Sequence, residues 1–149
     1  MRKRLVLADS SVWIHFLRTG DPHPSALILQ TLLRQDLIAT TWLVRLELLS
    51  GAPTEDAYRI LDADLAALRQ LALTDALFQE AGLLRWQLQR KGIIVPVVDS
   101  LIAACALHYD CALLHDDRHF RLIARHAPLR LYSLRAVRAS SPHLFRRLR

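Results

Sequence analysis

The sequence predicts an α/β fold with three layers, α/β/α, around a mostly parallel central sheet of about five strands. Short apolar segments alternate with helical patterns along the whole chain, as in proteins built from βα units. The chain has 149 residues, about the length of one domain with a sizeable core. No internal repeat, low-complexity segment or linker interrupts the alternation, so we expect residues 1–149 to form a single domain.

In the first half of the chain, apolar periodicity and helix breakers define each element. In order, they are a strand at residues 5–8 (LVLA), helices at 10–20 and 25–35, a strand at 36–40 (DLIAT) and a helix at 41–51. Gly20 and Gly51 are expected to close their helices. The prolines of DPHP, residues 21–24, prevent helix continuation and predict a turn.

The second half continues the alternation. In order, we expect a helix at 53–68, a strand at 70–74, helices at 74–92 and 100–109, a strand at 111–115 (CALLH), a helix at 116–126 and a fifth strand at 129–133. Leucines recur at helical spacing in the first helix, and Thr74 is placed to cap the second. Residues 134–149 form a basic C-terminal tail.

Composition favours a folded cytoplasmic protein with an anionic partner. The net charge is +6, and nearly all the cations are arginines, which bind phosphate and stack on bases. A GC-rich genome that prefers arginine codons would explain the same excess. No apolar stretch approaches the ~20 residues that a membrane span needs. Cys105 and Cys111 are expected to be reduced core residues.

Five acidic side chains stand at unusual places. Asp9 ends the first strand, and Asp116 and Asp117 end the fourth, so both strand ends face one crevice if the strands are neighbours. Glu47 interrupts an apolar helix, and Asp99 opens the alanine-rich one. A cluster of carboxylates needs a cation, and oxygen ligands suit Mg²⁺ or Mn²⁺. Such a metal beside arginines is suited to phosphodiester hydrolysis.

Each acid also has a structural explanation. Asp9 and Asp99 are each candidates for a helix N-cap, and Asp116 or Asp117 for the cap of the last helix, with Asp116 favoured as the structural one. Glu47 would be unremarkable on the solvent side of its helix.

Four segments resemble the ordered motifs of PIN-domain ribonucleases, specifically the VapC-type toxins of bacterial toxin–antitoxin pairs. They are LADSSVWI, RLELLSG, VVDSLIAACAL and LLHDDRHF. The resemblance covers nearly the whole chain and implies a PIN-like fold. It also implies that Asp9, Glu47, Asp99 and Asp117 bind Mg²⁺ or Mn²⁺ in a metal-dependent endoribonuclease. Such toxins are homodimers neutralised by a cognate VapB-type antitoxin, and RNA is their substrate.

The last motif departs from the family's usual pattern. His119 replaces an acid found in many relatives, which puts a fifth ligand in doubt, and His115 replaces a frequent Thr or Ser. Ser11 matches a frequent hydroxyl and is a candidate contact of metal-bound water or phosphate. Zinc binding by His115 and His119 together is an alternative. The remaining histidines show no ligand spacing: His15, His23, His108, His126 and His143.

Arginines near these motifs are candidate phosphate contacts, with solvated surface residues as the alternative. They are Arg45, Arg85, Arg118 and Arg121. The main functional rival is a catalytically silent PIN domain that binds RNA or a protein partner without cleaving. A haloacid-dehalogenase phosphatase is disfavoured because Ser11 stands where it needs a second Asp. A response-regulator receiver is disfavoured because no lysine follows Lys91.

Overall fold

A parallel four-stranded sheet forms the centre of the structure, a computed structural model that describes residues 3–18 and 23–132. The strand order is β3-β2-β1-β4, and every neighbouring pair is parallel. The strands are β1 (Val6–Ala8), β2 (Ile38–Thr40), β3 (Arg69–Gln70) and β4 (Ala112–Leu114). Over the described residues this confirms the predicted α/β class, with four strands in place of five.

The fifth strand is reduced to a single bridge. Leu131 pairs in parallel with Leu113, supported by hydrogen bonds from the Leu113 amide to the Arg130 carbonyl and from the Tyr132 amide to the Leu113 carbonyl, each 2.8 Å long. The pairing therefore begins where we predicted it but does not extend into a strand within the described residues. The expected basic tail at 134–149 lies outside the described residues.

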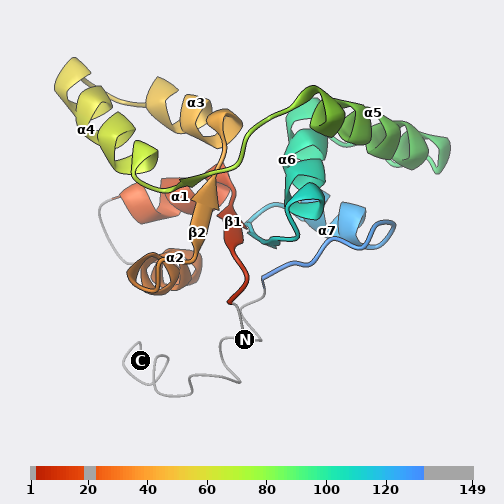
Figure 1. Cartoon of the computed structure of the whole chain (residues 1–149), viewed down its shortest axis with the longest axis horizontal. Helices are drawn as coiled ribbons and strands as arrows, with labels where there is room; N and C mark the ends of the chain where they lie inside the picture. Colours follow the sequence, from red (N-terminus) through yellow and green to blue (C-terminus); the bar gives the residue numbers. More distant parts are fainter. Residues whose placement is uncertain (1–2, 19–22, 133–149) are drawn as a thin grey trace.

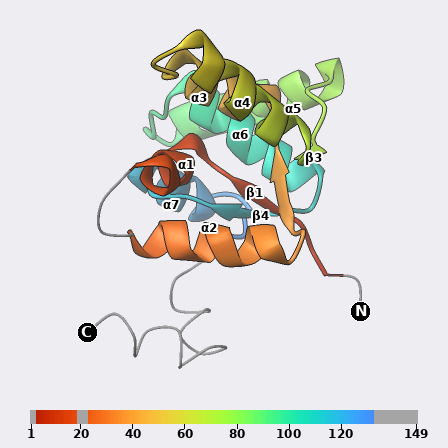
Figure 2. The same ribbon diagram turned by 90° about the vertical axis from the view of Figure 1, so that its left-hand side faces the viewer.

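Seven helices are present in the described ranges. They are α1 (Ser10–Leu17), α2 (Pro24–Arg34), α3 (Trp42–Ser50), α4 (Glu55–Ala66), α5 (Asp75–Arg90), α6 (Val97–His108) and α7 (Arg118–Ala124). In Figure 1, α1 and α2 lie on one side of the sheet and α6 and α7 on the other, while α5 packs on the outside of α6. Turned by 90°, the molecule shows α1 and α2 in front of the strands (Figure 2). These are the three layers that the sequence predicts.

The direction of the connections explains the layers. The chain moves outward from β1 to β2 to β3 and then returns across the sheet to β4. Right-handed crossovers place helices on opposite faces when this direction reverses. β1 and β4 are therefore parallel neighbours from which the chain continues toward opposite edges of the sheet. Their carboxyl ends form the topological switch point, where ligands bind in open α/β sheets.

Several element boundaries differ from those predicted. α1 ends at Leu17, and Gly20 lies outside the described residues. α2 begins one residue early because Pro24 fits the first helical position. Thr74 and Gly51 are the caps that we predicted, and Thr54, expected inside the next helix, caps it instead. The helix after Thr54 ends at Ala66, so β3 begins at Arg69 and is shorter than the predicted strand.

One apolar cluster joins the sheet to its covering helices. The central strands contribute Leu7 and Leu113, and α6 contributes Ile102, all almost fully buried. Cys105 and Cys111 are free, buried thiols, as predicted. Burial raises the pKa of Cys105 to about 12 and that of Cys111 to about 11, so both remain protonated at neutral pH. Along the described parts of the chain, no helix is long and apolar enough to cross a membrane.

Candidate functional site

The candidate site forms where β1 and β4 end side by side. The Asp9 amide donates a 2.9 Å hydrogen bond to the Leu114 carbonyl, which continues the pairing one residue beyond β1. This contact fixes Asp9 beside the loop that leads from β4 to α7. The first and fourth strands are neighbours, which is the condition under which we expected both strand ends to face one crevice.

Asp9 caps α1 and is 5% exposed. Its Oδ2 accepts a 3.2 Å bond from the Ser11 amide and a 2.7 Å bond from the Ser11 hydroxyl. Desolvation by burial raises the pKa of Asp9, the Ser11 hydrogen bonds oppose this rise, and the negative charge of Asp117 adds to it. Asp9 is therefore a helix N-cap, and in this position its carboxylate lies close enough to Asp117 to feel its charge.

Asp99 lies in the first turn of α6 and is not its cap, because Pro96 occupies that position without a side-chain bond. This corrects the alternative reading of Asp99 as an N-cap. Burial, then the charges of Asp117 and Asp9, raises the pKa of Asp99 to about 6. The three carboxylates Asp9, Asp99 and Asp117 are therefore close enough to repel one another through the protein.

Asp117 is the N-cap of α7, so the cap is this residue and not Asp116 as we predicted. Its Oδ1 accepts a 2.9 Å bond from the His119 amide. The Asp117 amide donates to Nδ1 of His115 over 3.1 Å. Burial lowers the pKa of His115, and the nearby Arg121 lowers it further, so a neutral imidazole orients Asp117 at pH 7.

His119 joins the acids through its side chain. Its Nδ1 lies 3.0 Å from Asp99 Oδ2 and 3.0 Å from Asp117 Oδ1, yet this buried atom has no well-directed hydrogen bond. One ligand atom from each of these three residues lies within 4.8 Å of the others. A buried nitrogen without a hydrogen bond between two carboxylates fits a divalent cation, whose ligands would be the same atoms.

Glu47 lies on α3 and is exposed. The Ser10 hydroxyl donates to Glu47 Oε2, which links α3 to the first residue of α1. Neither Glu47 nor Asp9 belongs to the metal-capable groups found in the described residues, but the charge of Asp9 acts on Asp99 and that of Asp117 acts on Asp9. The structure therefore brings Asp9, Asp99 and Asp117 together and leaves Glu47 at the rim beside them.

Ser10 is a contact that the sequence analysis missed, because only Ser11 matched a recognised pattern. The Ser11 hydroxyl makes two hydrogen bonds within the protein. It donates to Asp9 and accepts a 3.0 Å bond from the Asp116 amide, so it ties the end of β1 to the loop after β4. Both serines act on the acids and hold them in place.

Of the four arginines that we predicted to contact phosphate, two are engaged with the protein and two line a cavity. Arg45 is 6% exposed, donates to Asp62 Oδ1 over 2.8 Å and to Gln70 Oε1 over 3.0 Å, and stacks over Trp42. The prediction is wrong for Arg45, since its guanidinium is buried between α3, α4 and β3. Arg85 donates weakly, over 3.4 Å, to the Val95 carbonyl.

Arg118 and Arg121 lie beside the acids. With His119 and Arg125 they line an open cavity of about 360 Å³ next to α7. Arg125 is a further cation that the sequence analysis did not single out; it follows Arg121 by one helical turn. A row of cations bordering a carboxylate cluster can hold a polyanion while the acids hold its counterion.

Comparisons with known proteins agree with the predicted family and with the fold described above. A family model described as "PIN domain" matches residues 6–126. The chain is 31% identical over 136 residues to ribonuclease VapC11 of Mycobacterium tuberculosis, covering 88% of this chain and all of that protein. Two solved complexes share its fold: VapBC2 of Rickettsia felis, bound to a promoter DNA fragment, and VapBC-5 of M. tuberculosis, from the VapBC family of toxin-antitoxin systems.

The structural matches extend over most of each chain. For VapBC2 the TM-score is 0.70 at 23% identity, with 86% of this chain and 97% of the other covered. For VapBC-5 the TM-score is 0.59 at 22% identity, with 89% and 100% covered.

Ionisation of Asp99 should make the metal-free protein less stable. Its folded pKa of about 6 exceeds the ordinary value of 3.8, so the folded state binds the proton more tightly and loses stability as pH rises from about 4 to 6. Asp99→Asn removes this loss. We expect it to raise the free energy of unfolding by about 1–2 kcal/mol at about pH 7.5 and to have little effect below about pH 4.

Urea unfolding in EDTA over this pH range measures the difference. Asp56→Asn, an exposed acid in the first turn of α4, is the matched control and should show no such pH dependence. A stabilisation by Asp99→Asn that is equal at all pH values would contradict the electrostatic origin.

Proposed function

The chain belongs to the PIN-domain family, and we propose that it is a metal-dependent endoribonuclease, the toxin of a VapBC-type toxin–antitoxin pair acting in the cytoplasm. One observation carries the proposal. Asp9, Asp99 and Asp117 come from three separate segments and converge at the topological switch point, where burial and then their mutual repulsion raise the pKa of Asp99 to about 6. A protein retains such repulsion where the charges bind a cation.

Mg²⁺ or Mn²⁺ would be held by these three carboxylates, with Glu47 completing the set from the rim. His119 adds a nitrogen donor, which suits Mn²⁺ better than Mg²⁺. The ion would supply the charge that activates water and stabilises the leaving oxygen of an RNA phosphodiester. Ser11 and His115 orient Asp9 and Asp117 through the hydrogen bonds described above.

RNA would enter along the cationic side of the site. Arg118, Arg121 and Arg125 border the cavity that contains His119, so the phosphates next to the scissile bond would bind there. Phosphate contacts position a nucleic acid without reading its bases. These arginines therefore explain affinity for RNA as a class, with the choice of target left to other contacts.

The metal requirement is tested by replacing one ligand with an isostere. Asp9→Asn keeps the cap of α1, because Asn caps helices as well as Asp, but removes the charge. We expect cleavage of RNA in Mg²⁺ or Mn²⁺ to fall by a factor on the order of 10³, since metal ligation supplies several kcal/mol to the transition state. Cleavage should also stop in EDTA and be unchanged in the Asp56→Asn control.

A broad panel including tRNA and rRNA is the appropriate substrate set. Calorimetric titration with Mn²⁺ gives a second measurement that is independent of turnover. Cleavage that survives both chelation and Asp9→Asn would overturn the metal assignment. RNA binding without cleavage across the panel would favour the catalytically silent PIN domain.

The proposed antitoxin partner has a suitable groove between α1, α3 and α4. This groove, of about 640 Å³, is lined mainly by apolar side chains such as Leu17 and Ile60, which are 47% and 64% exposed, and Glu47 lies at its edge. An amphipathic helix could bury its apolar face here. A cationic side chain on that helix would then reach Glu47 and block the site.

Substitution in this groove should separate inhibition from catalysis. Ile60→Glu places a charge against the apolar helix and should weaken antitoxin binding at least 10-fold, while RNA cleavage by the free toxin stays unchanged. Surface plasmon resonance with the cognate VapB-type antitoxin measures the affinity. Equal affinity of Ile60→Glu and the unmodified chain would place the antitoxin elsewhere.

We also propose a homodimer through α5. This helix packs only one side on α6 at the outer edge of the molecule (Figure 1), and it exposes Phe78, Leu83 and Trp86. Their exposed fractions, 52%, 56% and 57%, are high for large apolar side chains. Aromatic side chains of this kind dominate the energy of protein interfaces.

A charge on α5 should therefore produce monomers. We expect Trp86→Glu to convert a dimer into a monomer in light scattering at micromolar concentration, with the far-UV circular dichroism unchanged. Ile60→Glu is the reciprocal control and should remain dimeric. A dimer that persists in Trp86→Glu would exclude the centre of this face as the interface.

A further inference from the structure

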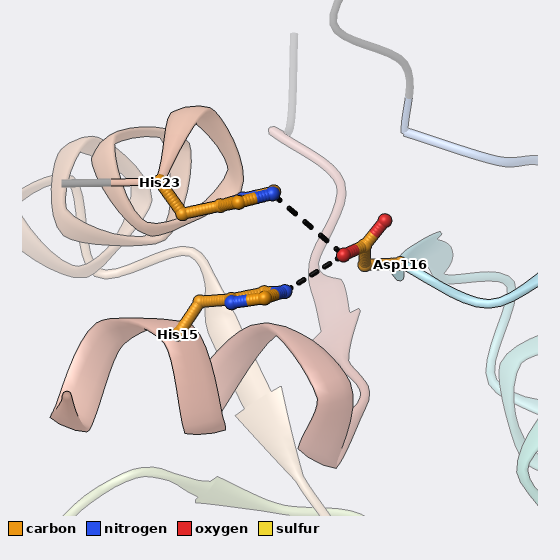
Figure 3. Close-up of side chains that lie close together, drawn as sticks. All are labelled: His15, His23 and Asp116. Atoms are coloured by element: carbon orange, nitrogen blue, oxygen red, sulfur yellow. Dashed lines mark hydrogen bonds and ion pairs between the residues drawn. The ribbon is translucent and has the colours of Figure 1, made fainter. Parts of the chain in front are cut away.

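Two histidines and an aspartate form a second cluster outside the acidic site. His15 Nε2 lies 2.7 Å from Asp116 Oδ2, and His23 Nε2 lies 3.8 Å from the same oxygen. The two imidazole rings are stacked, 3.8 Å apart and within 5° of parallel. Figure 3 shows both rings presenting a nitrogen edge to the single carboxylate. The spacing of these histidines in the chain shows no ligand pattern, so no ligand role was predicted for them.

Three separate segments build this cluster. His15 lies on α1 one turn after Ser11, and both contact Asp116: Ser11 Oγ accepts the Asp116 amide and His15 bonds the carboxylate. His23 caps α2. Since Asp116 directly precedes Asp117, one short loop supplies a ligand to each of the two clusters.

The donor atoms fit a first-row transition ion. Imidazole nitrogen suits Zn²⁺, which takes His nitrogen and carboxylate oxygen at about 2.0–2.2 Å and keeps an open position when three protein ligands are present. Tetrahedral ligands at that distance lie about 3.4 Å apart. The two nitrogen–oxygen distances, 2.7 and 3.8 Å, lie on either side of this value. Because an imidazole binds a metal in the plane of its ring and the two rings are nearly parallel, the rings must also tilt out of the stack for both Nε2 atoms to face one ion.

His23 also has a partner for its second ring nitrogen. Its Nδ1 lies 2.6 Å from the Ser25 hydroxyl, and the Ser25 amide donates to the same nitrogen over a longer 3.2 Å. With a metal on Nε2, Nδ1 carries the proton and donates it to Ser25 Oγ, while the longer amide contact is given up. A partner on the second ring nitrogen is the usual arrangement at metal-bound histidines.

Space for additional ligands exists beside the cluster. A cavity of about 210 Å³ is lined by His23, Asp116, Ser25 and Arg121, among others. The side chains of His15 and His23 are 24% and 38% exposed, so an ion can enter without unfolding.

We propose that His15, His23 and Asp116 form a Zn²⁺ site, distinct from the carboxylate site, that joins α1, the start of α2 and the β4–α7 loop. The two sites differ in chemistry, since one offers two nitrogens and one oxygen and the other mostly oxygens. Zinc at this position would hold the loop that carries Asp117 against α1. The proposal does not depend on ribonuclease activity.

The test is a titration of the metal-stripped full chain with Zn²⁺ by calorimetry, and with Co²⁺ by visible absorption. It uses a His119→Gln background, because His119 is the nitrogen donor of the acidic cluster and offers Zn²⁺ a competing position. We expect one tight equivalent in this background, because the acidic cluster then offers only oxygen ligands, which suit Zn²⁺ less well than imidazole nitrogen. Adding His15→Gln should weaken binding at least about 100-fold, and adding Ser25→Ala about 10-fold.

His108→Gln is the matched control. His108 pairs with Glu80 over 3.0 Å, a histidine–acid contact remote from the cluster, and its substitution should leave Zn²⁺ affinity unchanged. Zinc at about 100 times its Kd should raise the Tm of the background protein by roughly 5–10 °C and that of His15→Gln far less.

Two results would overturn the proposal. One is loss of all Zn²⁺ binding tighter than about 1 mM once His119 is replaced. The other is an affinity and a Co²⁺ spectrum that do not change when His15→Gln is added. Because the readouts are binding, absorption and melting, they stand apart from any result of the RNA cleavage assay.

Discussion

The parallel pairing of β1 with β4 is the contact on which the rest of the site depends. It is extended by the bond from the Asp9 amide to the Leu114 carbonyl, 2.9 Å long. The two strands come from opposite ends of the chain, and this pairing alone brings Asp9 beside Asp117. Because β1 is also an inner strand of the sheet, the same pairing that buries its side chains also positions Asp9 at its end.

Repulsion among the carboxylates is the electrostatic consequence of that pairing. Burial and neighbouring negative charge raise the pKa values of Asp9 and Asp99. The protein offsets this repulsion in part with hydrogen bonds, from Ser11 to Asp9 and from the His119 amide to Asp117. A cation at the acids would reduce the remaining repulsion, which is the physical reason why we place the metal there.

A structural role and the proposed metal-binding role coincide at two of the acids. Asp9 caps α1 and Asp117 caps α7, so the alternatives of helix cap and site residue do not exclude each other. A cap holds its side chain at the start of a helix, and in this fold α1 and α7 start at the edge where ligands bind. Asp99 needs no capping role, because α6 directs its first turn to the same edge.

The sequence by itself determined the α/β class and most helix starts, since periodicity and caps are local patterns, and it showed acids at the ends of the first and fourth strands. The choice of Asp117 over Asp116 as a site residue came from the resemblance to PIN-domain motifs. The tertiary structure decided that Arg45 is buried against Asp62, that the fifth strand is one bridge, and that Glu47 stands at the rim with Ser10. It also brought His15 to Asp116, 101 residues later in the chain. Such pairs follow from which strands become neighbours, and no local pattern records that choice.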